Sequence, residues 1–260
     1  MLPDFLLLGA PKCGTSALHN ALRTHPQLFL PTVKEPKFFL TDGPPPDSGG
    51  GPGDVETWGE HVWRREDYEA LFADAPPDTH RGEGTVFYLY DRDAHRRIHD
   101  LVPDARLVAV LRDPVERAHS NWSHLRGAGL EPEADFLAAC RLEPQRREAG
   151  WAHFWHYVAA GRYGEQLEHL LKTFDREQVL LLRYRDLRDE PTTTADRECA
   201  FLGVETGRID GVPRHHVRTD VSGRTSGPTT AERAAALEWF ADDVVRLEEL
   251  TGWDLADWRR

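Results

Sequence analysis

Three short apolar runs alternate along the chain with segments whose apolar residues recur at helical spacing. The runs are Phe5–Leu8, Leu107–Leu111 and Val179–Leu187, the last of which is most apolar over its first four residues. Each is nearly continuous, as is typical of a strand buried on both faces of a parallel sheet. Because helical patterns follow the runs, the chain is predicted to have an α/β fold, with helices flanking a central, mainly parallel sheet.

Helix boundaries are predicted from periodicity and from terminal signals. Pro114 stands where a helix can begin, and Thr229 and Glu232 have capping-box spacing ahead of a last helix that ends near Gly252. Leu237, Phe240, Val244 and Leu247 share one face of that last helix. A further strand is predicted at Val86–Tyr88, and further helices are predicted over residues 58–72, 94–102, 115–126, 131–149, 163–174 and 193–202.

The turn between the first run and the first helix contains Gly9, Pro11 and Gly14. A strand that enters a helix through such a loop directs backbone N–H groups at one point, which suits phosphate or sulfate. The spacing resembles the nucleoside-triphosphate motif GxxxxGK[ST], but Thr15 occupies the lysine position and the lysine of this loop is Lys12. An anion site is therefore predicted, without the lysine that contacts β- and γ-phosphates.

Two stretches after the first helix are predicted to be non-helical. Leu28–Leu40 contains two prolines and should be extended, so that its charged residues lie on a loop or edge. Gly43–Gly53 reads GPPPDSGGGPG and is predicted to be flexible, either as an idle surface loop or as a mobile flap beside the site.

Composition sets the class of protein. The chain has 260 residues, 40% of them hydrophobic and 29% charged, which fits one soluble globular domain spanning residues 1–260. The first residues resemble a core strand more than a signal peptide, and no apolar run has the length of a membrane span. The formal net charge of -12 argues against nucleic acid or a sulfated glycan as the main partner.

Cysteine and histidine usage predicts a reducing compartment without a metal centre. Cys13, Cys140 and Cys199 are too scattered for a disulfide framework, so we expect a cytoplasmic protein. The pairs His153/His156 and His215/His216 lack a cysteine or carboxylate at ligand spacing. No metal site is predicted.

Several stretches resemble, in family order, the sulfotransferases that use 3′-phosphoadenosine 5′-phosphosulfate (PAPS), especially their bacterial and heparan-type branch. The family's 5′-phosphosulfate loop is similar to PKCGTSAL, residues 11–18, which His25 and Pro26 follow. A second family signature is similar to LVAVLRDPVERAHSNW. The resemblance extends to KEPKFF at residues 34–39, to residues 161–187 and, more weakly, to SGRTSGP.

The resemblance implies a P-loop-like three-layer fold. It also implies transfer of a sulfuryl group from PAPS to a hydroxyl, or as second choice an amine, of a sugar or small natural product. Adenosine 3′,5′-bisphosphate is then the second product, and no metal takes part. The implied catalytic residues are Glu35 as general base with Lys12 and Lys37. The implied donor-binding residues are Pro11, Lys12, Cys13, Gly14, Thr15, Ser16 and Ala17 for the 5′-phosphosulfate, and Arg112, Ser120, Gly223 and Arg224 for the 3′-phosphate side.

One departure from the family pattern concerns Gly84, which stands where heparan-type members often carry a lysine. A cation on the acceptor or sulfuryl side is therefore missing or replaced. Two other functions stay open from the residues. A P-loop kinase would use ATP and Mg²⁺ with Asp113 as the metal-binding carboxylate, and a non-catalytic nucleotide-binding module would bind without transfer. The oligomeric state is left open.

Overall fold

The computed structural model describes residues 1–212 and 227–260. Within them the chain forms two compact units, the first made of residues 1–45, 60–112 and 169–212, the second of residues 46–59, 113–168 and 227–260. Gly223 and Arg224 lie outside the described residues. Of the described helices, none is long and apolar enough to cross a membrane.

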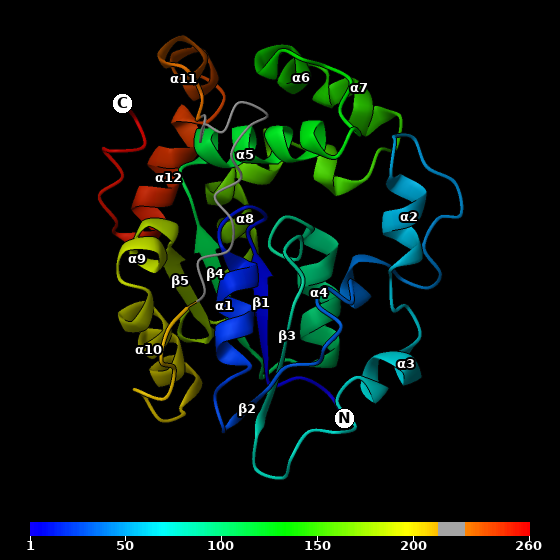
Figure 1. Cartoon of the computed structure of the whole chain (residues 1–260), viewed down its shortest axis with the longest axis vertical. Helices are drawn as coiled ribbons and strands as arrows, with labels where there is room; N and C mark the ends of the chain where they lie inside the picture. The colour runs from blue at the N-terminus through cyan, green and yellow to red at the C-terminus, as the bar shows by residue number, and fades with distance from the viewer. Residues whose placement is uncertain (213–226) are drawn as a thin grey trace. The chain divides into compact units, whose positions relative to one another are not determined.

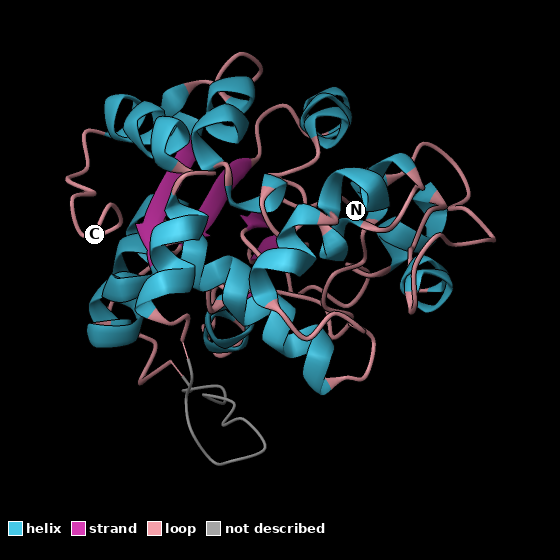
Figure 2. Ribbon diagram, turned by 90° about the horizontal axis from the view of Figure 1, so that it is seen from above, coloured by secondary structure: helices cyan, strands magenta, loops and turns pink. Residues whose placement is uncertain are grey.

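A parallel sheet of 5 strands in the order β2-β3-β1-β4-β5 forms the centre of the first unit (Figure 1). The strands are β1 (Phe5–Gly9), β2 (Leu28–Phe29), β3 (His80–Gly84), β4 (Arg106–Leu111) and β5 (Val179–Arg183). They are drawn in magenta in Figure 2. The described helices of this unit are α1 (Thr15–Leu22), α3 (Arg65–Ala70), α4 (Arg92–Leu101), α9 (Tyr184–Asp189), α10 (Pro191–Leu202) and the short 3-10 helices η1 (Phe38–Leu40) and η4 (Arg176–Gln178). The predicted α/β fold with a central parallel sheet flanked by helices is confirmed.

The apolar runs form the core of this sheet. Every residue of β1 is buried, and Leu107 to Leu111 of β4 are each at most 1% exposed. Continuous burial is expected of a central parallel strand, which has no solvent face. β1 lies between β3 and β4, so the loop that follows it leaves the sheet near its middle.

The second unit is mostly helical in its described residues. Its elements are α2 (Asp54–Gly59), α5 (Pro114–Gly127), α6 (Phe136–Arg141), α7 (Glu143–Glu148), α11 (Thr230–Leu237), α12 (Ala241–Thr251) and the 3-10 helices η2 (His153–Trp155) and η3 (Ala159–Gly161). Helix α8 (Tyr163–Leu170) begins in this unit and ends in the first. Asp243 of α12 caps α8, because its carboxylate accepts the N–H groups of Gly164 at 2.8 Å and Glu165 at 2.9 Å.

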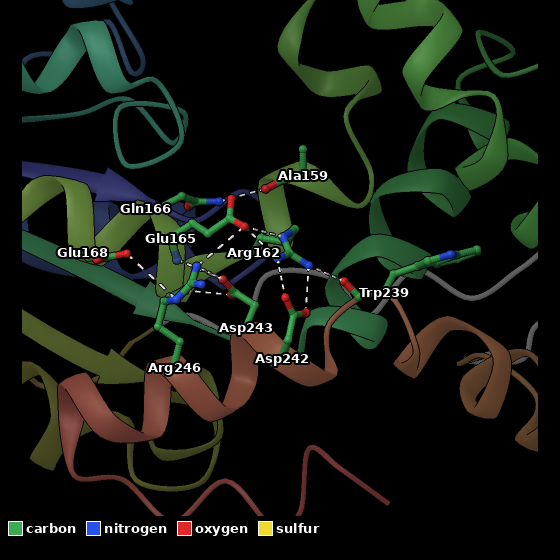
Figure 3. A network of polar contacts seen from close by, with 10 residues as sticks. Ala159, Arg162, Glu165, Gln166, Glu168, Trp239, Asp242, Asp243 and Arg246 are labelled. Atoms are coloured by element: carbon green, nitrogen blue, oxygen red, sulfur yellow. Dashed lines mark hydrogen bonds and ion pairs between the residues drawn. The ribbon is translucent and has the colours of Figure 1, made fainter.

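Ion pairs surround that cap (Figure 3). Arg162, just before α8, donates to both carboxylate oxygens of Asp242 at 3.0 and 2.9 Å and to the carbonyl oxygen of Trp239 at 2.8 Å. It also binds Glu165, which Arg246 approaches to 3.7 Å. These contacts join the beginning of α8 to the beginning of α12.

The GPPPDSGGGPG stretch has defined contacts where it belongs to the second unit. The buried carboxylate of Asp54 accepts the N–H of Gly51 at 2.7 Å, the N–H of Ala152 at 3.2 Å and the indole N–H of Trp155 at 2.9 Å. A Cβ on Gly50 would lie 2.6 Å from the carbonyl oxygen of Ala149. Glycine is therefore needed where this loop packs closely. The single-domain organisation and the flexibility of residues 43–53 stay predictions.

Several sequence-based boundaries are wrong. The third strand is His80–Gly84, and residues Val86–Tyr88 form a turn after it. The helix predicted over 58–72 is replaced by α2 and α3, and the one over 131–149 by α6 and α7. The strand predicted over 179–187 ends at Arg183, because α9 begins at Tyr184. The helix over 163–174 ends at Leu170, and the last predicted helix is split into α11 and α12 at residues 238–240. The capping box at Thr229 is confirmed.

Candidate functional site

The loop between β1 and α1 has the backbone of an anion-binding turn. Gly14 is the N-cap of α1 with φ 81°, and Lys12 also has a positive φ, 67°. A Cβ at Gly14 would lie 3.2 Å from side-chain atoms of Leu187 and Tyr184. Position 14 therefore requires glycine for its conformation and for its close packing.

The side chains of this loop alternate between the core and the surface. Pro11, Cys13, Thr15 and Ala17 are buried, whereas Lys12 is partly exposed and Ser16 is exposed. Within the described residues, no side chain caps the beginning of α1. The N–H groups of Ala17 and Leu18 donate to the carbonyl oxygen of Gly14, which leaves the N–H groups of Thr15 and Ser16 ahead of the first helical hydrogen bond. Such N–H groups, together with the positive end of the helix dipole, favour phosphate or sulfate.

Arg112 follows β4 and reaches this loop. Its Nη1 donates to the carbonyl oxygen of Lys12 at 3.4 Å, and its guanidinium carbon lies 4.8 Å from the ring centroid of Tyr184. An arginine is permanently charged and presents several donors in one plane. The structure thus brings one predicted 3′-phosphate residue to the loop predicted for the 5′-phosphosulfate.

Glu35 and Lys37 lie on the segment between β2 and η1. Both have left-handed backbones, with φ 61° and 60°. The ammonium group of Lys34 is ion-paired with the Glu35 carboxylate, whose side chain is 26% exposed. The Lys37 ammonium binds Glu60 at 2.6 Å, and the backbone N–H of Lys37 donates to the hydroxyl of Thr85 at 3.1 Å. This last bond anchors the segment to the residue that follows β3.

The carboxyl ends of three neighbouring strands therefore carry the candidate residues of the first unit. β1 is followed by residues 10–14, called the anion loop below for its predicted role, β3 by Thr85 and β4 by Arg112. Leu7 of β1 pairs with Gly84 of β3, so the two strands end at the same edge. Ligands of open α/β sheets bind outside this edge.

Gly84, the position of the departure from the family pattern, is confined. A Cβ built there would lie 3.2 Å from Cβ of Leu7 and 3.6 Å from Cδ2 of His19. The ring of His19 is 1% exposed, and its pKa is lowered to about 4, first by burial and then by the charge of Lys34. The charge of Lys34 therefore acts on a ring that lies beside position 84.

Glu83, one residue earlier, is a functional candidate that the sequence reasoning missed. It is 0% exposed, and burial raises its pKa to about 7 although hydrogen bonds from Tyr88, Thr85 and Tyr68 oppose the shift. The nearby charge of Glu35 also raises this pKa. The available signal was spacing, because Glu83 and Thr85 lie two residues apart and so point to one side of the chain as it leaves β3.

The remaining predicted residues are in the second unit or outside the described chain. Ser120 lies on α5, partly exposed. Since Arg112 and Ser120 belong to different units, their joint binding of one phosphate stays a prediction, as do the roles of Gly223 and Arg224.

Asp113, the metal-binding carboxylate of the kinase hypothesis, has a structural role. It is the N-cap of α5 and accepts the N–H of Glu116 at 2.9 Å. Both of its oxygens also accept from Arg233, at 3.1 and 2.6 Å. The helix cap and the bidentate ion pair with Arg233 together explain why a carboxylate stands at this position.

The first unit thus has the fold of α/β proteins with a glycine-bearing loop after a central strand of a parallel sheet. Residues 92–224 match the model of the sulfotransferase domain family. A sulfotransferase from Alicyclobacillus acidocaldarius has a solved structure that is similar over 100% of both chains, with a TM-score of 0.88 and 34% sequence identity. The chain belongs to the sulfotransferase domain family.

Curated relatives come from the heparan-type branch. The human heparan sulfate glucosamine 3-O-sulfotransferase 6 is 28% identical over 207 residues, covering 78% of this chain and 53% of the relative. The mouse bifunctional heparan sulfate N-deacetylase/N-sulfotransferase 4 is 26% identical over 215 residues, covering 78% of this chain and 22% of the relative. This chain therefore spans about half of the first relative and about a fifth of the second.

Proposed function

We propose that the chain transfers a sulfuryl group from PAPS to a hydroxyl of a sugar or small natural product in the cytoplasm. The observation that carries the proposal is the convergence of three elements at one edge of the sheet: the anion loop, Arg112 on the carbonyl of Lys12, and the Glu35 segment bound to Thr85. Membership of the sulfotransferase family supports the same reaction.

In this proposal the loop amides and Lys12 bind the 5′-phosphosulfate, and Arg112 binds the 3′-phosphate. The acceptor oxygen attacks sulfur while its proton passes to Glu35, and the bond from sulfur to the bridging phosphate oxygen breaks. The developing charge remains on adenosine 3′,5′-bisphosphate. Fixed cations and amides directed at that charge lower the barrier.

Lys34 and Lys37 have supporting roles. The ion pair with Lys34 restricts the orientation of the Glu35 carboxylate. Lys37 forms an ion pair with Glu60, whose side chain is 67% exposed. Breaking so exposed an ion pair costs little free energy, so Lys37 can bind a sulfuryl oxygen instead. Lys34 also supplies a positive charge near Gly84, where the heparan-type lysine is missing.

The acceptor is proposed to carry less negative charge than heparan sulfate. The relatives named above act, by their names, on heparan sulfate. This chain has a net charge of -12 and lacks the lysine at position 84. A polyanionic acceptor would be repelled over long range, whereas a neutral sugar or small natural product would not.

The donor is tested by thermal unfolding with adenosine 3′,5′-bisphosphate compared with ATP and Mg²⁺. A ligand that binds only the native state stabilises it by about 2.7 kcal/mol at one hundred times its Kd. We expect stabilisation by the bisphosphate and little by ATP. A clear preference for ATP with Mg²⁺ would overturn the donor assignment.

The base is tested by Glu35→Gln. Turnover should fall at least ~100-fold while affinity for the bisphosphate stays within about twofold, because the carboxylate contributes to proton transfer and not to donor binding. Lys12→Ala should lose both turnover and donor affinity. A mass-spectrometric screen for sulfated products identifies the acceptor.

A further inference from the structure

A buried carboxylate lies directly beneath the segment that carries Glu35. Glu83 is the residue before the last one of β3, and it is 0% exposed. The hydroxyl of Tyr68, from α3, donates to its Oε1 at 3.1 Å, and the hydroxyl of Thr85 donates to its Oε2 at 3.1 Å. The hydroxyl of Tyr88 is also hydrogen-bonded to it. Three hydroxyl groups therefore converge on one carboxylate.

Two of these hydroxyls also bind the backbone of the Glu35 segment. Thr85 accepts the N–H of Lys37 at 3.1 Å, and Tyr88 accepts the N–H of Phe39 at 3.3 Å. Phe39 packs edge-on against Tyr88 with 5.5 Å between ring centroids. The same two side chains thus connect Glu83 to the backbone on either side of Phe38.

The direction of these hydrogen bonds depends on Glu83. An ionised carboxylate can only accept, so the hydroxyls of Thr85 and Tyr88 donate inward to it and present lone pairs outward. Those lone pairs are what the two backbone N–H groups require. A donor in place of the carboxylate would turn a hydroxyl around, and that hydroxyl would then meet a backbone N–H with its own hydrogen.

We propose that Glu83 is a positioning residue for sulfuryl transfer: through Thr85 and Tyr88 it fixes the backbone of residues 37–39 and thereby the placement of Glu35. The inference rests on the proposed role of Glu35 as base. It matters because Glu35 and Lys37 both have left-handed backbones, which residues other than glycine adopt only when their surroundings hold them there.

The groups that act on the titration of Glu83 come from each neighbouring segment. They are Tyr68 from α3, Thr85 and Tyr88 after β3, and the carboxylate of Glu35. Burial and Glu35 favour the protonated acid, and the three hydroxyls favour the carboxylate. Since the pKa of Glu83 is about 7, its carboxyl group loses its proton in this pH range, and the hydroxyls of Thr85 and Tyr88 then both donate to it.

The test is Glu83→Gln, which keeps the shape and adds a donor. Turnover, measured as release of the bisphosphate from PAPS with the acceptor found in the screen, should fall ~10- to 100-fold, with bisphosphate affinity within ~2-fold. Amide hydrogen exchange at Lys37 and Phe39 should become at least ~10-fold faster. Turnover of the original chain should rise with pH around 7, where Glu83 loses its proton, and this rise should be absent from Glu83→Gln.

Two further variants and one control keep the result interpretable if Glu83→Gln folds poorly. Thr85→Val removes the relay hydroxyl and should reproduce the loss of turnover, whereas Thr85→Ser restores a hydroxyl and should remain within ~3-fold of the original chain. Glu198→Gln is the matched control. Glu198 is also 0% exposed, burial raises its pKa to about 8, and within the described chain its carboxylate has no hydrogen-bond partner. Its loss should leave turnover unchanged.

The readouts separate failure of this inference from failure of the proposed function. Unchanged exchange at Lys37 and Phe39 in Glu83→Gln overturns the inference whatever the reaction is. Faster exchange with unchanged turnover refutes the link to catalysis. Full turnover by Glu35→Gln instead removes the proposed base, and the exchange measurement still decides whether Glu83 holds the segment.

Discussion

The guanidinium of Arg112 lies over the ring of Tyr184, with 4.8 Å between the guanidinium carbon and the ring centroid. The two residues are the next ones after Leu111 and Arg183, which pair in the parallel register of β4 and β5. The sheet itself therefore sets this stacking. Stacking fixes the plane of a guanidinium while its edge can still donate to a planar or tetrahedral anion.

Arg112→Lys is expected to weaken binding of adenosine 3′,5′-bisphosphate ~10- to 100-fold, because an ammonium neither stacks nor donates in a plane. Isothermal titration calorimetry measures the change. Adenosine 5′-monophosphate is the control ligand, and its affinity should change less than about twofold. Equal loss for both ligands would show that Arg112 does not bind the 3′-phosphate.

Stability should depend on pH through Glu83. Its pKa is raised from 4.5 to about 7, so between these values the folded chain keeps a proton that the unfolded chain has released. The free energy of unfolding therefore falls as pH rises through this window, by on the order of 3 kcal/mol. Urea unfolding of Glu83→Gln should show a flatter dependence between pH 5 and 7. A slope equal to that of the original chain would contradict the shift.

The cap at the beginning of α8 should contribute measurably to stability. Asp243→Ala removes two charge-assisted hydrogen bonds to Gly164 and Glu165 and should lower the free energy of unfolding by about 2 kcal/mol. Asp242→Ala is the control. Asp242 is 64% exposed, and Figure 3 shows it in an ion pair with Arg162. Its loss should cost at most about 1 kcal/mol. Similar losses in urea unfolding would be evidence against the cap.

Asp54 should determine how tightly the glycine-rich stretch is held. Asp54→Ala removes the acceptor of three N–H groups, including those of Gly51 and Trp155. We expect limited proteolysis within residues 43–53 to become at least ~10-fold faster. Asp47→Ala, at an exposed position of the same stretch, serves as control and should leave the cleavage rate unchanged. Equal rates in both variants would indicate that other contacts hold the loop.

Sequence patterns predicted the parts of the fold that local chemistry determines. The runs at Phe5–Leu8 and Leu107–Leu111 are apolar throughout, as is typical of a strand in the centre of a parallel sheet. β3 was misplaced because its sequence, HRGEG, contains no β-branched or aromatic residue. Its pairing with β1 outweighs propensity, and the aromatic Val86–Tyr88 stretch packs in a turn instead.

The candidate site also has a part that was predictable from the sequence and a part that was not. The turn between β1 and α1 was predictable because Gly9, Lys12 and Gly14 are neighbours in sequence. The Glu83 network was not, because it joins Thr85 to Lys37 across 48 residues and Tyr88 to Phe39 across 49. Hydrogen bonds between such distant residues arise from packing, and a glutamate in a polar stretch appears solvated until a fold encloses it.

The packing at Gly14 limits how the protein can be redesigned. A Cβ at position 14 would lie 3.2 Å from side-chain atoms of Tyr184 and Leu187, so these neighbours would have to shift, and Tyr184 also stacks on Arg112. The loop and the first residues of α9 are therefore matched parts. A replacement loop with a larger residue at position 14 would need room at Tyr184 or Leu187 and a residue that tolerates the positive φ of Gly14. The sequence of this loop is consequently tied to that of a segment far away in the chain, and the two must be engineered together.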